Sequence, residues 1–229
     1  MRPLFLSLLL LLLTAPSYAQ TAQQWRDSLS VLNSLIDQQP RSTDLRLRKA
    51  AVNIQLGQWD YAADEYSRVL QIDADNLAAL YYRAFTYTHQ RQYALARADY
   101  EHFLRLSPLH LEARLGLATV NEKMGRVREA LDGYNQLVEM FPDSALCYAA
   151  RAAFETSQQQ YDVALYDWDA AISRQPFNAD YVVTKADLLL RLGRPADARA
   201  TLEKALRQGV PRGVLREWFD KCRAAQATR

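Results

Sequence analysis

The feature that most constrains the fold of this 229-residue chain is a 34-residue period marked by proline and alanine. Four prolines fall on one grid, at Pro40, Pro108, Pro142 and Pro176, and the grid position without proline is Ala74. Two sets of alanines follow the same period: Ala50, Ala84, Ala118, Ala152 and Ala186, then Ala62, Ala96, Ala130, Ala164 and Ala198. A period kept over five copies indicates an internal repeat whose units stack on one another.

Each unit has the pattern of two helices joined by a short turn. Apolar residues recur at helical spacing, as in Leu77, Leu80, Ala84 and Tyr87, and polar turns such as Gly57-Gln58 interrupt them. The alanines allow two backbones to approach closely, and a large residue follows the second alanine by four positions. These large residues are Tyr66, Tyr100, Tyr134, Trp168 and Leu202. The sequence therefore predicts an all-α fold of antiparallel helix pairs.

The ends of these helices are also marked. Each grid proline ends a second helix, because it lacks the backbone N–H and disfavours helix in the residue before it. Two residues after each grid point stand Ser42, Asn76, His110, Ser144 and Asn178. All but His110 are good N-cap residues, which predicts that the next helix begins there.

In these features the chain resembles the tetratricopeptide repeat family. The resemblance covers an N-terminal helix, or half repeat, in residues 20–40 and five repeats in residues 41–212, followed by a C-terminal capping helix and tail in residues 213–229. The five repeats occupy about 43–76, 77–110, 111–144, 145–178 and 179–212. The resemblance implies a right-handed α-α superhelix, a solenoid whose first helices line a concave groove.

Residues 1–19 have the layout of a signal peptide. Arg2 precedes an apolar run from Leu4 to Leu13, and Ser17 and Ala19 supply small residues before Gln20. The run is about half the ~20 residues that a membrane-spanning helix needs. We expect cleavage after Ala19 and an exported protein, periplasmic or secreted, with no membrane span after cleavage. The alternative is an uncleaved membrane anchor.

The net charge of the chain limits the classes of partner that we expect it to bind. The net charge of +2 falls to about +1 when Arg2 is removed with the signal peptide, which argues against nucleic acid or an anionic membrane as partner.

An exported chain with two cysteines raises the question of a disulfide. In the resembled architecture Cys147 and Cys222 lie at least two interhelix spacings apart, ~16 Å against a limit of ~7 Å between bridged Cα atoms. We predict two free thiols.

Bases and acids repeat with the same period. Lys49, Arg83 and Arg151 each precede a first-helix alanine, and sixteen residues after them stand Glu65, Asp99 and Asp167. Where the base becomes Leu117, the acid becomes Gly133. The pattern predicts ion pairs between the two helices of a unit, worth ~0.2 to 1 kcal/mol if exposed. The alternative is a row of cationic ligand sites. Lys185 has Thr201 opposite it, which this rule does not explain.

No recognisable catalytic constellation is present in the sequence. The three histidines, His89, His102 and His110, have no second histidine or cysteine at metal-ligand spacing. The chain has no glycine-rich phosphate loop, GxSxG or HExxH motif. We expect no catalytic residues, no metal and no cofactor, and therefore no enzyme. An active site assembled from residues distant in the chain is the alternative.

The stretch YYRAFTYTHQRQYALA, residues 81–96, is the most aromatic candidate for a binding surface. Leu80, Ala84 and Tyr87 share one helix face, which the alanine assigns to the core, and Tyr81, Phe85 and Thr88 share another. Groove sites of the family, carried onto this chain residue by residue, give the candidate partner-binding residues Leu47, Arg48, Tyr81, Tyr82, Phe85, His89, Thr119 and Glu122. The alternative for the aromatics, favoured most at Tyr81, is packing against neighbouring first helices.

The resemblance implies a protein or peptide as partner, held in an apolar, aromatic-anchored groove by a non-catalytic scaffold. Some family members grip acidic C-termini with Lys and Asn at the fifth and ninth positions of an early repeat, but here those positions hold Leu47 and Ala51. The chaperone carboxylate clamp is therefore not expected. The alternative function is a structural subunit of an envelope complex that docks through its convex face or its ends.

Overall fold

The computed structural model describes residues 21–227, and the predicted signal peptide, residues 1–19, lies outside them. The described residues form helices and no strands. The helices are α1 (Ala22–Gln38), α2 (Thr43–Gln55), α3 (Trp59–Ile72), α4 (Leu77–His89), α5 (Tyr93–Leu106), α6 (Leu111–Lys123), α7 (Val127–Met140), α8 (Ala145–Ser157), α9 (Tyr161–Arg174), α10 (Ala179–Arg191), α11 (Pro195–Gln208) and α12 (Arg212–Ala227). Over this part of the chain, no helix is both long enough and apolar enough to cross a membrane.

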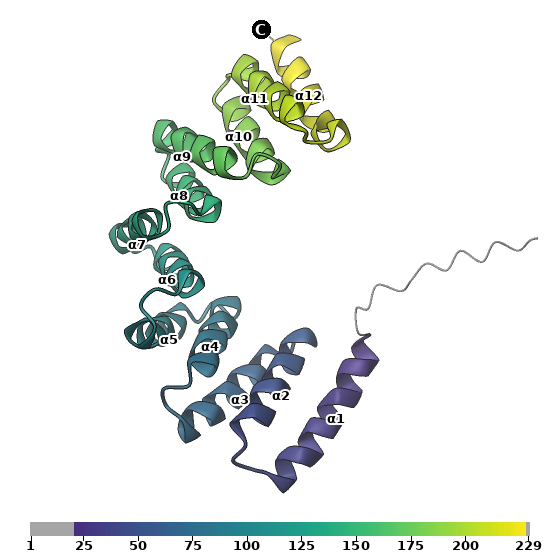
Figure 1. Ribbon diagram of the computed structural model, residues 1–229, viewed down its shortest axis with the longest axis vertical. Coiled ribbons are helices and arrows are strands. Elements are labelled where there is room, and N and C mark those ends of the chain that lie inside the picture. Colours follow the sequence, from purple (N-terminus) through teal and green to yellow (C-terminus); the bar gives the residue numbers. More distant parts are fainter. Residues whose placement is uncertain (1–20, 228–229) are drawn as a thin grey trace, which may run out of the picture.

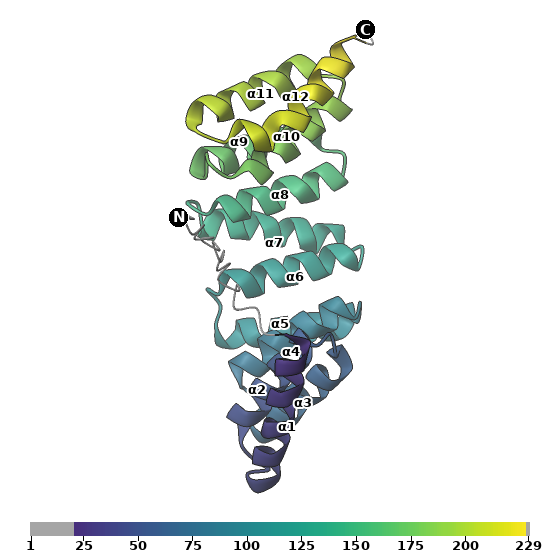
Figure 2. The same cartoon turned by 90° about the vertical axis from the view of Figure 1, so that its right-hand side faces the viewer.

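The helices stack in chain order into an arc. Neighbouring helices pack in sequence, and α12 also packs against α10. In Figure 1 the first helices α4, α6 and α8 lie on the inner side of the arc, and α5, α7 and α9 lie on its outer side. Figure 2 looks onto the inner side, where the first helices cross the arc like rungs. The predicted all-α solenoid of helix pairs is confirmed.

The alanines of the 34-residue period lie in the core of this stack. All ten are buried, each 1% exposed or less, and the large residues that follow the second set are buried beside them. A larger side chain at any of these positions would push two helices apart or force strained rotamers. The repeat is therefore a packing requirement of the helix pair.

The N-caps follow the predicted positions with two differences in chemistry. Ser42, Asn76 and Asn178 accept a hydrogen bond from a backbone N–H of the first turn, as predicted. Ser144 occupies the N-cap of α8 but makes no such side-chain bond. His110, which we did not expect to cap well, accepts the N–H of Ala113 through Nδ1 at 3.2 Å. The imidazole nitrogen takes the place of a hydroxyl or amide oxygen.

Cys147 and Cys222 are both free and buried, which confirms the prediction of two thiols. Burial is also the main reason that the pKa of each thiol is raised, so both favour the neutral form.

The three predicted ion pairs are present, but they are not the exposed pairs that we expected. The carboxylates of Glu65 and Asp99 are buried, and that of Asp167 is completely so. Burial removes solvation from a carboxylate, so its base becomes necessary to the fold. The strength of ~0.2 to 1 kcal/mol, which was expected for exposed pairs, therefore does not apply to these buried carboxylates.

Two of these bases also reach the preceding repeat. Arg83 donates to both carboxylate oxygens of Asp99, each at 2.7 Å, and its third nitrogen donates to Ser67 on α3 at 3.0 Å. Arg151 has the same arrangement with Asp167 and, at 3.0 Å, Asn135 of α7. Each guanidinium therefore joins the second helix of its own repeat to the second helix of the preceding repeat. Its partners lie sixteen residues after it and sixteen residues before it.

This backward contact explains Lys185, which the sequence rule left without a partner. Its Nζ lies 2.6 Å from the carboxylate of Asp169, sixteen residues earlier on α9. In repeat three, where the ion pair is absent, a Cβ built on Gly133 would lie 3.0 Å from that of Ala118. The glycine allows α6 and α7 to pack closely at the place where other repeats hold an acid.

Replacing Arg83 with Met tests the buried pair. The change leaves Asp99 buried without its base, so the free energy of unfolding should fall by about 3 kcal/mol. The control is Arg199→Met, which breaks a pair with Glu203 in which both side chains are roughly half exposed, and it should cost less than about 0.5 kcal/mol. Urea unfolding followed by circular dichroism measures both. Equal losses in the two variants would contradict the assignment.

Glu155 gives the stack a dependence on pH. The residue is buried on α8, and its Oε2 atom has no hydrogen-bond partner among the described residues. Burial, and then the neighbouring Asp167, raise the pKa of Glu155 to about 7, against the opposing effect of Arg151. The folded state therefore binds a proton more readily than the unfolded state between the two pKa values. Stability should fall as pH rises from about 4.5 to about 7 and stay level above that range.

Glu155→Gln should remove this fall, because the amide stays neutral at all pH values in the range. At pH 8 the variant should exceed the original chain in free energy of unfolding by up to about 3 kcal/mol, and by little at pH 4.5. Urea midpoints measured across this range test the prediction, with the exposed Glu139→Gln as control. A Glu155→Gln curve parallel to that of the original chain would disprove it.

Candidate binding surface

The exposed side of α4 is the most aromatic part of the inner face. The flanking helices α3 and α5 lie on the outer side of the arc, so the solvent-exposed side of α4 turns inward (Figure 1). Tyr82, which is 47% exposed, lies on this side, and His89 is exposed one turn from the half-buried Phe85. These three residues follow the spacing i, i+3 and i+7, so they form one stripe along the helix.

Two residues of α3 stack on this stripe, one near each of its ends. The Trp59 ring stacks on the His89 ring, with centroids 4.4 Å apart and planes 7° from parallel, and Phe85 meets His89 edge-on at 4.5 Å. Farther along, Tyr66 stacks on Tyr82 at 6.1 Å. We call these five side chains the aromatic platform. Each ring restrains its neighbour, so the platform is held in place before any partner arrives.

Tyr66 is the buried member of the aromatic platform. It is buried, and burial together with the nearby Tyr82 raises the pKa of its hydroxyl. The hydroxyl therefore stays protonated at all ordinary pH values. Tyr82 projects from this buried ring toward solvent, as a side chain that is anchored on one side and open on the other.

Leu47 and Tyr81, two of the predicted binding residues, pack mainly into the core. Leu47 lies against the buried cluster of repeat one, and Tyr81 lies against that of repeat two. The Tyr81 ring contacts the rings of Phe103 and His110, at 5.8 and 5.5 Å. The packing alternative therefore applies to both residues, because the fifth site of each first helix faces the neighbouring helices.

The other predicted residues lie apart from the platform. Arg48 is exposed on α2 and pairs with Asp44 at 3.0 Å. In repeat three the Tyr134 hydroxyl donates to Glu122 at 2.9 Å and lies 3.4 Å from the Thr119 hydroxyl. Burial raises the pKa of Tyr134, which keeps that hydroxyl a donor. Thr119 and Glu122 thus have a structural partner of their own.

Sequence reasoning did not include Trp59 and Tyr66 in the surface. The groove sites were taken from first helices only, whereas both of these residues belong to a second helix. Trp59 reaches the inner face because it is the first residue of α3, beside the last turn of the antiparallel α4. A tryptophan directly after the Gly57-Gln58 turn was the available signal.

On the next first helix, α6, Gly116 lies directly against Tyr100 of α5. A Cβ built there would lie 2.5 Å from the ring of Tyr100, whose buried side chain fills this space. Burial is the main cause that raises the pKa of Tyr100 to about 12. The next first helix, α8, carries small side chains at the partly buried Ala150, which packs against a core cluster, and at the exposed Ala153. Among the residues that the structure covers, no three His, Cys, Asp or Glu side chains gather closely enough to hold a metal ion.

Two glycine-to-alanine changes in helices should have opposite effects. Gly116→Ala forces the buried Tyr100 ring to move and should lower the free energy of unfolding by about 1 to 3 kcal/mol. Gly213→Ala on α12 meets open space and should raise it by about 0.5 kcal/mol, because alanine loses less backbone entropy in a helix. Thermal and urea unfolding measure both. A stabilised Gly116→Ala variant would show that Tyr100 does not occupy this space.

Comparisons with known proteins agree with the repeat architecture. Family models described as tetratricopeptide repeat match residues 17–76 and 149–212, and another of the same description matches residues 87–154. A tetratricopeptide repeat protein from Parabacteroides merdae has a solved structure with a TM-score of 0.65 and 20% identity, covering 87% of this chain and 78% of that one. The solved structure of YrrB, described as having an unusual peptide-binding site, gives a TM-score of 0.60 and 17% identity, covering 86% and 97%.

Curated relatives are longer than this chain. The DnaJ homolog subfamily C member 7 homolog of Dictyostelium discoideum is 22% identical over 214 residues, which cover 86% of this chain and 40% of that protein. The chain spans 40% or less of the length of the curated proteins that it matches. The similarity therefore concerns only a part of each of these proteins.

Proposed function

This chain belongs to the tetratricopeptide repeat family, and we propose that it is a non-catalytic interaction module that holds a peptide or protein segment on the inner face of its arc. Proteins of this fold commonly serve as interaction scaffolds, and YrrB, a neighbour in fold, is described as having a peptide-binding site. Fold alone does not assign a function, so the proposal depends on the surface of this particular chain.

The observation that carries the proposal is the aromatic platform. Tyr82 leaves nearly half of its surface open although it stacks on the buried Tyr66. Exposed aromatic rings that are already held in place make good binding anchors, because they offer a large area with few rotatable bonds. An apolar side chain of a partner would cover Tyr82, while its backbone follows the smaller residues toward α6 and α8.

The export prediction extends the proposal to a location. We place the module outside the cytoplasm, in the periplasm or beyond, on the basis of residues 1–19. A partner would then be an envelope or secreted protein. We also propose that the chain has no catalytic activity of its own, and that activity in its setting belongs to the partner that it holds.

Tyr82→Ala should abolish partner capture while leaving helicity and melting temperature nearly unchanged, because the ring projects to solvent. The matched control is Tyr166→Ala, since Tyr166 is 70% exposed on the outer helix α9. A photo-crosslinking residue at the exposed Ala153 of α8 would capture the partner in the native compartment, and mass spectrometry would identify it. Equal capture by Tyr82→Ala and the original chain would remove the platform from consideration.

Exposed apolar residues on the outer helices favour a second candidate, a structural subunit that docks through its convex face. Tyr61, Val163 and Tyr166 are all about half exposed or more, and the first two occupy the same position of the 34-residue period. Such side chains suit a flat protein surface better than an extended peptide. Crosslinks that form from Tyr166 and not from Ala153 would favour this candidate over the first.

A further inference from the structure

Helix α12 stands in the register of a first helix of another repeat. It begins at Arg212, and the N-cap residue Asn178 of α10 lies 34 residues earlier. Helices α9 and α11 end at Arg174 and Gln208, which are also 34 residues apart. The packing follows the same register, because Leu188 of α10 and Cys222 of α12 are both buried. Positions of α11 and α12 can therefore be compared with those of α9 and α10.

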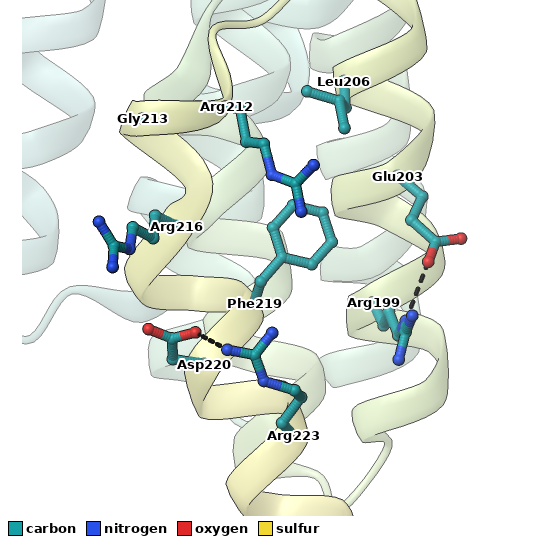
Figure 3. Close-up of a pocket in the computed structure, with 9 residues that line it drawn as sticks. All are labelled: Arg199, Glu203, Leu206, Arg212, Gly213, Arg216, Phe219, Asp220 and Arg223. Atoms are coloured by element: carbon teal, nitrogen blue, oxygen red, sulfur yellow. Dashed lines mark hydrogen bonds and ion pairs between the residues drawn. The ribbon is translucent and has the colours of Figure 1, made fainter.

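This register identifies the hollow drawn in Figure 3, a cavity of about 580 Å³ between α11 and α12. In repeat five, α11 occupies the corresponding place beside α9 and α10. Two pockets that α11 lines there are also lined by Leu165, Asp169 and Ile172 of α9 and by Lys185 and Leu189 of α10. Adding 34 to each number gives Arg199, Glu203, Leu206, Phe219 and Arg223, all of which line the hollow. The hollow is the seat of a second helix, and no helix of residues 21–227 fills it.

The side chains of this seat differ in chemistry from those of repeat five. Val182, Ala186 and Leu189 of α10 are buried in the same apolar cluster as α11. Their counterparts on α12 are Arg216, Asp220 and Arg223. The side of α12 that faces the hollow is therefore charged where the matching side of α10 is apolar. A second helix with the sequence of α11 would not pack against it.

The charge of the seat is positive on balance. Four arginines line it, with Glu203 and Asp220 as the acids. Arg199 pairs with Glu203, and Arg223 pairs with Asp220, as the dashed lines of Figure 3 show. Arg212 and Arg216 have no carboxylate partner within the described part of the chain. They stand at the first turns of α12, where backbone N–H groups and the helix dipole add to the attraction for anions.

An apolar floor lies under these charges. Phe219 and Leu206 are half-buried and pack against the last core cluster, and Figure 3 shows Phe219 between the two helices. A site for free anions does not need an apolar floor. A site for an amphipathic helix does, because such a helix presents apolar residues at the centre of one face and charged residues on either side.

We propose that this seat, called here the terminal seat, binds an acidic amphipathic helix of a partner protein as the second helix of a further repeat. All five second helices of the array are 14 residues long, which gives the length that fits. One apolar side chain of the partner covers Phe219 and Leu206, and carboxylates on its flanks meet Arg212 and Arg216. This surface is separate from the aromatic platform, and binding there does not depend on the proposed function.

Solvation of an array end does not by itself account for this composition. The end of a repeat array needs a polar outer face, and side chains of either sign would serve. Here the basic residues are all arginine, whose planar guanidinium binds carboxylates with two parallel hydrogen bonds and is weakly hydrated. Arginine is therefore better suited to a protein interface than to plain solvation.

The test uses a synthetic 14-residue, alanine-based peptide with a leucine pair at i and i+4 flanked by glutamates. The purified protein should bind this peptide in fluorescence anisotropy and lose affinity as salt rises. The double variant Arg212→Glu, Arg216→Glu should bind roughly tenfold more weakly or not at all, because two attractive charges become repulsive. The double variant Arg105→Glu, Arg128→Glu makes the same charge change at exposed positions of α5 and α7 and should bind as the original chain does.

Two altered peptides and one further variant separate a helix bound in the terminal seat from general attraction of acidic chains. A peptide with lysine in place of glutamate should not bind, and one with a central proline, which breaks the helix, should bind at least fivefold more weakly. Tyr82→Ala should keep full binding, so the outcome is independent of the aromatic platform. Three results would overturn the proposal: absence of binding, equal binding of the proline peptide, or equal binding to both double variants. The second would show that the arginines attract acidic chains of any conformation, and the third that the peptide binds elsewhere.

Discussion

A buried carboxylate that is neutralised by a base of a first helix is the interaction on which the rest of the arc depends. Arg83 and Arg151 each hold an acid of their own second helix and a polar side chain of the preceding one. An acid without water is stable only in the presence of its base, so these two arginines fix how the helix pairs of repeats two and four sit on the pairs before them. Repeat three replaces the charges by close contact between Gly133 and Ala118.

These contacts decide which side of each first helix is available to a partner. On each first helix, the side that carries the base and the alanine faces the outer helices. The opposite side of the helix therefore stays exposed along the inner face of the arc. On α4 this side is aromatic, and Trp59 and Tyr66 of α3 hold its rings in place. The same stacking that builds the core therefore preorganises the aromatic platform, which lowers the entropy lost on binding.

The two proposed binding surfaces differ in chemistry. At the aromatic platform the anchors are neutral rings, whereas at the terminal seat the apolar positions of repeat five are occupied by Arg216, Asp220 and Arg223. One 34-residue repeat pattern can carry both binding surfaces, because the residues that hold the helices together are distinct from the residues that are exposed. One surface suits an apolar segment, and the other suits an acidic helix.

The sequence by itself determined the repeat, the helix pairs, the buried alanines and the three ion pairs, because each depends on residues at fixed spacing within one unit. The tertiary structure alone decided which side chains are buried and which contacts form between units. It showed that the paired acids are buried, that Lys185 bonds backward to Asp169, and that Leu47 and Tyr81 pack against the core. It also brought Trp59 to His89, two residues of different repeats. Contacts between units depend on how helices pack in three dimensions, and a period along the chain does not record that geometry.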